Sequence, residues 1–187
     1  MSARARLFAF SLCLAFVSGA KADVVAILNL DATVVGQAAP YGANPVNIFL
    51  GPGTYFVTAV GIAGGGLYDA WSAFSSNTNC QPDHTCLYGW DASFDYSFSG
   101  GYFSLDNGIR WDSPAEALAH APSATFTLTV GETVSFGINE CLGCLADNRG
   151  GNSLAIDAVP EPTTMAGLTI LFGVLFASRS RRKRADG

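Results

Sequence analysis

The stretch from Trp90 to Ser99 reads WDASFDYSFS and alternates apolar with polar residues at every step. Its apolar positions are Trp90, Ala92, Phe94, Tyr96 and Phe98, and an acid or a hydroxyl follows each of them. Successive side chains of a β-strand point to opposite faces of the sheet. The period of two therefore predicts a half-buried antiparallel strand, with its apolar side chains in a core and its polar side chains outside.

Further strand signals lie on both sides of this stretch. They cover residues 23–30, 46–50, 54–62, 68–74, 124–130, 133–139 and 153–158. Glycine-containing turns separate several of them, and a capping serine followed by proline predicts one short helix at residues 113–120. Short strands at this spacing favour an all-β fold, a two-sheet antiparallel β-sandwich of jelly-roll character. A closed barrel is the alternative.

The first 22 residues have the pattern of a secretory signal peptide. Arg4 and Arg6 precede an apolar run at residues 7–17, and the small residues Ala20 and Ala22 occupy the −3 and −1 positions of a cleavage site. We expect export and cleavage after Ala22. The alternative is an ordinary buried helix.

A second apolar segment lies near the C-terminus, at residues 163–178. A helix of this length would span about 24 Å, which is enough for a thin membrane crossing. A basic cluster follows it, which the positive-inside rule keeps in the cytoplasm. Its members are Arg179, Arg181, Arg182, Lys183 and Arg184.

The whole segment 159–187 resembles the PEP-CTERM sorting signal of bacterial exosortase systems. It starts with Val159, Pro160, Glu161 and Pro162 and continues with the apolar helix and the basic tail. The resemblance implies a transient membrane anchor, which an exosortase-type membrane protease cleaves near the Pro-Glu-Pro motif. The processed protein would then be released or attached at the cell surface. The alternative is a permanent single-span anchor.

Between the two signals, residues 23–158 form one domain with an unbalanced charge. They contain 13 acids and only two cations, Arg110 and Arg149, so the formal charge is 2 − 13 = −11. A domain this acidic repels nucleic acid, and it suits cations or neutral sugars as ligands.

Four cysteines remain after signal cleavage, namely Cys80, Cys86, Cys141 and Cys144. An even number in an exported domain predicts disulfides, and three pairings are open. We favour the local pairs Cys80–Cys86 and Cys141–Cys144. The alternative is a zinc site that also uses His84, although only one pair has the zinc spacing.

The loop at residues 139–153 is rich in oxygen ligands and glycines. Glu140, Asp147 and Asn148 could bind calcium, which prefers carboxylate, amide and carbonyl oxygens. The spacing of these three residues is similar to the calcium loop of small bacterial galactose-binding lectins, although the cysteine pair and Arg149 depart from that pattern. The alternative is a turn in which the polar side chains bond their own backbone.

Residues 53–74 resemble a block that recurs in exported PEP-CTERM proteins. Within it, Tyr68, Asp69 and Trp71 could form a platform on which a sugar stacks. Burial of the aromatic rings in the sandwich is the alternative.

The sequence has no Gly-x-Ser-x-Gly elbow, His-Glu-x-x-His motif or phosphate loop. We therefore predict a non-catalytic protein of the cell surface or extracellular matrix that binds exopolysaccharide, with calcium as cofactor. The alternatives are a purely structural matrix or adhesion component and an extracellular hydrolase.

Overall fold

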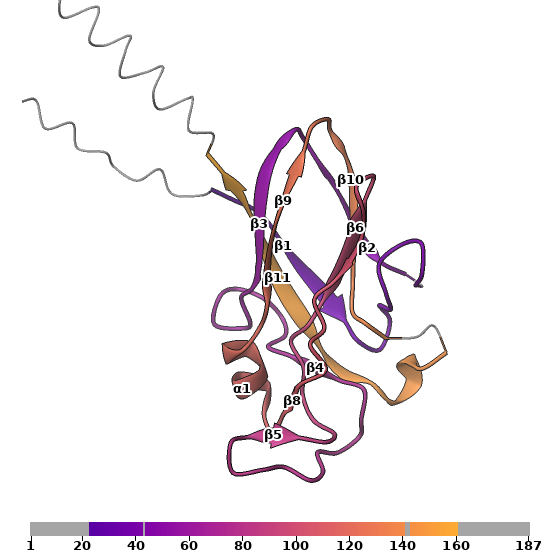
Figure 1. Cartoon of the computed structure of the whole chain (residues 1–187), viewed down its shortest axis with the longest axis vertical. Helices are drawn as coiled ribbons and strands as arrows, with labels where there is room; N and C mark the ends of the chain where they lie inside the picture. Colours follow the sequence, from indigo (N-terminus) through magenta and orange to yellow (C-terminus); the bar gives the residue numbers. More distant parts are fainter. Residues whose placement is uncertain (1–22, 43, 141–142, 161–187) are drawn as a thin grey trace, which may run out of the picture.

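Two antiparallel sheets pack face to face, and a smaller lobe extends from one end of them (Figure 1). The computed structural model describes residues 23–42, 44–140 and 143–160. The predicted signal peptide, the apolar segment 163–178 and the basic tail lie outside the described residues, as do Glu161 and Pro162. Within the described ranges, no helix is long and apolar enough to cross a membrane.

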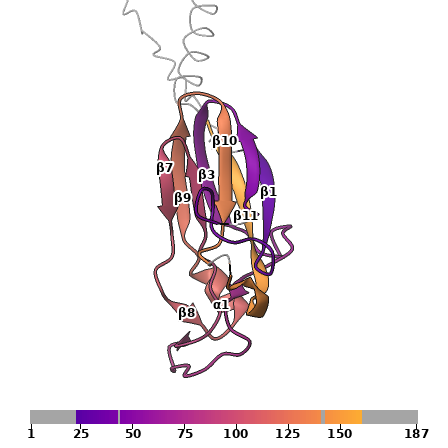
Figure 2. The same cartoon turned by 90° about the vertical axis from the view of Figure 1, so that its right-hand side faces the viewer.

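The two sheets contain five and four of the described strands, and the short strand β4 (Trp71–Ser72) pairs with β11 beside the continuous order of the first sheet. The first sheet has the order β1 (Asp23–Asp31), β11 (Arg149–Val159), β3 (Gly53–Ala59) and β9 (Ser123–Leu128). The second sheet has the order β2 (Val46–Leu50), β10 (Glu132–Gly137), β6 (Asp95–Phe98) and β7 (Gly101–Ser104). Figure 1 shows the two layers side by side, and in Figure 2, turned by 90°, the strands of the two sheets overlap.

The strand pairing is that of a jelly roll. Strands β1 and β11, β2 and β10, β3 and β9, and β6 and β7 form four antiparallel pairs. Successive pairs alternate between the two sheets, which is the nested arrangement of two Greek keys. The predicted all-β sandwich of jelly-roll character is therefore confirmed.

The core lies between the two sheets and is rich in aromatic rings. Tyr96 stacks on Phe126 and Phe136, with centroid distances of 5.3 and 6.1 Å. Strand β9 alternates between exposed and buried residues along its whole length, as a strand that covers one side of a core should. The apolar face predicted for residues 92–98 contributes Phe94 and Tyr96 to this core.

The other face of the 90–99 stretch differs from the prediction. Asp91, Ser93, Asp95 and Ser97 are all buried, although the alternation places them outside. The loop at residues 36–41 covers Asp95, whose carboxylate accepts a hydrogen bond from the Ala38 amide. The prediction that this polar face is exposed is therefore wrong. At Asp95 the reason is the loop at residues 36–41, which is distant in the sequence and folds over the face.

The lobe contains the short strands β4 (Trp71–Ser72), β5 (Thr85–Cys86) and β8 (Arg110–Trp111) and the helix α1 (Pro114–Ala119). The strand predicted at residues 68–74 is thus reduced to two residues. The predicted helix is confirmed, since Ser113 caps it by accepting a hydrogen bond from the Glu116 amide at 3.2 Å. Trp90 packs against the alanines of the lobe, and not in the sandwich core as predicted.

The described chain starts and ends at the same end of the sandwich. Asp23 lies opposite Ala158 in the first sheet, and β11 continues to Val159, which pairs with Thr54. The lobe lies at the opposite end (Figure 1). The described chain therefore ends on the side of the sandwich away from the lobe.

Candidate functional site

A row of polar side chains crosses the outer face of the second sheet. The pairing register places Asn47 of β2 opposite Ser135 of β10, Ser135 opposite Ser97 of β6, and Ser97 opposite Tyr102 of β7. Their neighbours along each strand point into the core, so the four side chains share the outer face. Ser135 Oγ donates a hydrogen bond to Asn47 Oδ1 at 2.7 Å.

The loop at residues 36–41 forms a wall beside this row. The Ile138 amide donates to the Gly36 carbonyl oxygen at 3.0 Å, which fixes the loop on β10. A side chain at Gly137 would collide with that same oxygen. Glycine is therefore required at position 137 for the loop to lie so close to the sheet.

The row of polar side chains and the loop at residues 36–41 line an open groove of about 450 Å³. Tyr41 and Tyr102 meet edge to face at its side, with ring centroids 4.9 Å apart, and Tyr41 is 64% exposed. The groove therefore combines aromatic rings with hydroxyl and amide groups. Its lining residues are Ala39, Pro40, Tyr41, Asn47, Ser97, Phe98, Ser99, Gly101, Tyr102, Thr133 and Ser135.

A buried carboxylate holds the two sides of the groove together. Asp95, which is 0% exposed, accepts a hydrogen bond from the Tyr102 hydroxyl at 2.6 Å and another from the Ala38 amide at 2.7 Å. Burial raises the pKa of Asp95 above its ordinary value of 3.8. Burial, together with the bond to Asp95, also raises the pKa of Tyr102. Tyr102 is thus neutral and fixed in orientation.

The lining of the groove is uncharged, and the two ionisable side chains that bond to it, Asp95 and Glu132, are acidic. None of its lining residues carries a charge. At its rim, Glu132 accepts hydrogen bonds from the amide and the hydroxyl of Ser99, both at 2.8 Å. Such a surface disfavours anionic ligands and accepts neutral, hydroxyl-rich ones.

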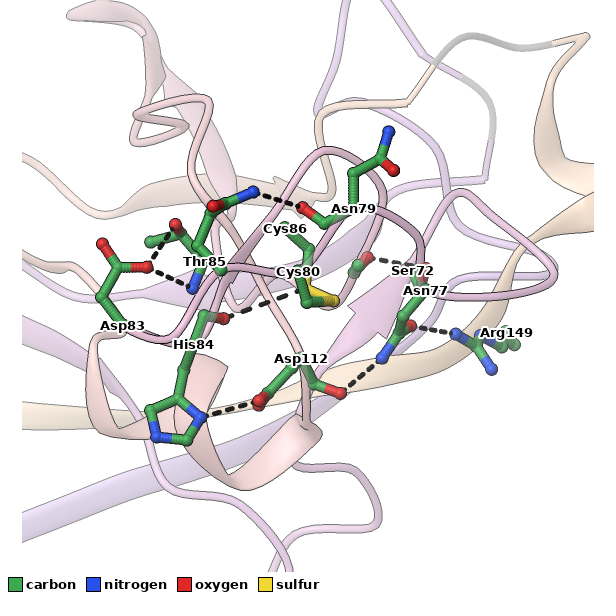
Figure 3. Close-up of a disulfide and its surroundings, with 12 residues drawn as sticks. Ser72, Asn77, Asn79, Cys80, Asp83, His84, Thr85, Cys86, Asp112 and Arg149 are labelled. Atoms are coloured by element: carbon green, nitrogen blue, oxygen red, sulfur yellow. Dashed lines mark hydrogen bonds and ion pairs between the residues drawn. A yellow bond between two sulfur atoms is a disulfide. The ribbon is translucent and has the colours of Figure 1, made fainter.

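Both cations of residues 23–158 lie in or beside the lobe. Arg110 forms an ion pair with Asp91 at 2.7 Å. Arg149 donates to Asn77 at 2.7 Å (Figure 3). Its guanidinium also lies over the Trp90 ring, 4.3 Å from the ring centroid. Both guanidinium groups are thus held in or beside the lobe, and neither lines the groove.

The three residues predicted as a sugar platform have structural roles. Trp71 is 1% exposed, and its indole Nε1 donates to the Ser93 carbonyl oxygen at 3.2 Å. Asp69 accepts from the Ile62 amide at 2.7 Å, and the Tyr68 hydroxyl donates to Asp31 at 3.1 Å. Trp71 therefore cannot be part of the predicted sugar platform, because its ring is not accessible to solvent.

The predicted calcium ligands lie at the two ends of a loop of which Cys141 and Leu142 fall outside the described residues. Asn148 is buried and donates through Nδ2 to the Ala32 carbonyl oxygen at 2.9 Å, while its Oδ1 has no hydrogen-bond partner among the described residues. Asp147 is exposed and Glu140 is half-buried. In the described part of the chain, no three His, Cys, Asp or Glu side chains cluster as a metal site.

The predicted Cys80–Cys86 disulfide is present in the lobe (Figure 3). His84 forms a 2.7 Å pair with Asp112, and this hydrogen bond raises the pKa of His84. The zinc alternative at Cys80, His84 and Cys86 is therefore wrong, because the disulfide consumes both thiolates. The Cys141–Cys144 pair includes a residue outside the described ranges and stays a prediction.

Sequence reasoning missed the groove. Ser97 belongs to the alternating stretch, but its neighbours across the sheet are 38 residues downstream at Ser135 and five residues downstream at Tyr102. Only the strand register brings them together. Tyr41 lies in a loop and has no local pattern that would mark it.

Comparisons with known proteins add no relative. A scan against models of protein families finds no match to this chain, and searches of curated proteins and of solved structures find none either. The geometry of the site therefore carries the functional argument.

Proposed function

We propose that this chain is an exported, non-catalytic protein of the cell surface or extracellular matrix that binds neutral polysaccharide in the groove on its second sheet. The observation that carries the proposal is an uncharged floor of hydroxyl and amide groups beside the exposed ring of Tyr41. Pyranose rings have apolar C–H faces that stack on aromatic rings and hydroxyl edges that hydrogen bond. The groove offers a partner for both.

The same proposal includes the route by which the protein reaches its place. The PEP-CTERM-like segment would anchor the chain in the membrane until an exosortase-type protease cleaves it. Val159, the first residue of the motif, is the last residue of β11, so the cleavage region follows the sandwich directly. An anchor there would direct the lobe away from the membrane and leave the groove accessible on the side of the sandwich.

The groove itself favours binding over hydrolysis. A glycosidase needs two carboxyl groups beside the scissile bond. No carboxylate lines the groove, and both oxygens of Asp95 beneath it accept hydrogen bonds from the protein. A hydrolase function would therefore need another site. A purely structural matrix role remains the competing proposal, and it predicts no saccharide binding at all.

Affinity pull-down tests the proposal. The full-length protein, in a zwitterionic detergent without a sugar headgroup, would be mixed with dextran, mannan, curdlan and agarose, and with alginate and polygalacturonate as anionic controls. We expect retention on at least one neutral polymer and on neither anionic one. Tyr41→Ala should abolish retention, whereas Tyr88→Ala, which removes an exposed ring in the lobe, should not. Retention that survives Tyr41→Ala, or that favours alginate, would contradict the proposal.

Calcium binding at the 140–148 loop is a second candidate. The observation that favours it is the buried Oδ1 of Asn148, which accepts no hydrogen bond from the described part of the chain. A ligand that binds only the folded state raises the melting temperature. If calcium binds there, a chelator should lower the melting temperature of the wild type and leave Asn148→Ala and Asp147→Ala unchanged. Equal melting temperatures of the wild type with and without chelator would eliminate the candidate.

A further inference from the structure

Phe49 is exposed on the same face as the groove. It lies on β2, two residues from Asn47 and directly opposite Thr133, and both of these residues line the groove. The ring is 69% exposed and lies next to the turn at Gly131, where an added Cβ would approach it to 2.9 Å. Phe49 therefore contributes little to the core, since Ile48 and Leu50 on either side of it face inward.

Phe49 and the Tyr41–Tyr102 pair lie at opposite sides of the polar row. The row runs from β2 through β10 and β6 to β7. Neighbouring strands lie about 4.8 Å apart, so the two aromatic positions are separated by roughly 14 Å across the sheet. One sugar ring cannot contact both, whereas a chain of three or more rings can.

The loop at residues 36–41 restricts the direction of such a chain. Gly36 and Ala38 lie over Gly137 and Asp95, the next outer-face positions along β10 and β6. A ligand cannot continue along the strands on that side. Across the strands, a ligand reaches the ends of the sheet at β2 and β7, which are its two edge strands.

We propose that the groove binds an internal segment of a linear neutral glycan, at least three sugar units long, which lies across the strands between the Tyr41–Tyr102 pair and Phe49. This inference rests on the proposed function and specifies its ligand. The two open ends allow the chain to extend beyond the sheet, so the interior of a polymer fits as well as its end. The uncharged lining beside acidic groups disfavours uronic-acid chains as ligands of this path.

The experiment is a titration of the full-length protein with size-fractionated fragments, of one to six units, of the neutral polysaccharide that the pull-down retains. We expect the six-unit fragment to bind at least tenfold more tightly than the two-unit fragment. Phe49→Ala should weaken binding of the six-unit fragment about tenfold, the size expected for the loss of one stacking contact, and leave the two-unit affinity unchanged. Phe49→Tyr should restore the long-fragment affinity.

Val130→Ala is the matched control, since it shortens an exposed apolar side chain at the adjacent turn. Equal melting temperatures of the wild type and the Phe49 variants would show that the fold is intact. If the two-unit fragment binds as tightly as the six-unit one, or if Phe49→Ala weakens both equally, the extended path is wrong while the groove remains a binding site. If the pull-down retains no neutral polymer, the proposed function fails, and this inference fails with it.

Discussion

The sandwich and the lobe are stabilised in different ways. Seventeen buried residues form the core between the sheets, whereas the separate cluster in the lobe has only three buried members, Ala70, Ala92 and Ala117. Three alanines bury little apolar surface. Besides the packing of Trp90, Trp111 and Ala121 against these alanines, the lobe depends on its disulfide, on the Asp91–Arg110 ion pair and on the contacts of Arg149.

This difference bears on the groove. The acidic domain has two cations, and both are used to hold the lobe together. The outer face of the second sheet is left without positive charge, although it lies on the same small domain. The same placement of the two cations therefore stabilises the lobe and leaves the groove suited to a neutral ligand.

The largest loss of stability should come from the sandwich. Phe136→Ala removes a fully buried ring from the core, which typically costs about 3–5 kcal/mol of unfolding free energy. Phe49→Ala removes an exposed ring of the same size from the same sheet and should cost almost nothing. Urea unfolding of both variants measures the difference. Equal losses would mean that the core does not lie where the structure places it.

A loss of about 3 kcal/mol should follow from Arg110→Met. The change leaves the buried carboxylate of Asp91 without its positive partner, and such unpaired buried charges are costly. The double variant Arg110→Met/Asp91→Asn should recover part of this loss in the same urea experiment. If the double variant is as unstable as the single one, packing of the Arg110 side chain, and not its charge, supports the lobe.

Removal of the disulfide should have a smaller and local effect. Cys80 and Cys86 close a short loop, for which chain-entropy arguments give about 2 kcal/mol. We expect Cys80→Ser/Cys86→Ser to increase amide hydrogen exchange in the lobe and to leave exchange in β6 and β10 unchanged. Increased exchange in both regions alike would show that the two regions unfold as one unit.

The smallest effect, and one that depends on pH, should come from Asp95→Asn. Burial raises the pKa of Asp95, so above pH 3.8 this carboxyl holds more protons in the folded chain than in the unfolded chain. The unfolding free energy therefore falls as the pH rises from 3.8 through the pKa of the folded state. Asparagine can accept from the Ala38 amide through Oδ1 and donate through Nδ2 to the Tyr102 oxygen, so both contacts are kept without a charge, with the second one reversed in direction. The variant should therefore lose less stability between pH 4 and 8 than the wild type. Asp91, whose pKa burial also raises, retains part of the dependence. An unchanged pH profile would contradict this account of Asp95.

The sequence predicted features that depend on local pattern. The alternation at residues 92–98 identified the core face, Ser113 and Pro114 identified the helix, and the spacing of Cys80 and Cys86 identified a disulfide. Each of these depends on residues that are close along the chain.

The candidate site is formed by contacts between residues that are distant in the sequence, and local sequence patterns do not predict such contacts. Asp95 is buried because Ala38, 57 residues away, folds over it. Trp71 is an aromatic residue in a polar, glycine-rich segment, which fits a binding platform, yet it fills the core from a two-residue strand. The row from Asn47 to Tyr102 exists only once four strands have taken their register.

The central claim is that the outer face of the second sheet, and not the lobe, binds neutral saccharide. Amide chemical-shift mapping during titration with the six-unit fragment tests it most directly. The account predicts shifts at Asn47, Ser97, Tyr102 and Ser135 and none at residues 80–86. Shifts confined to the lobe, or to the loop at residues 143–148, would contradict it.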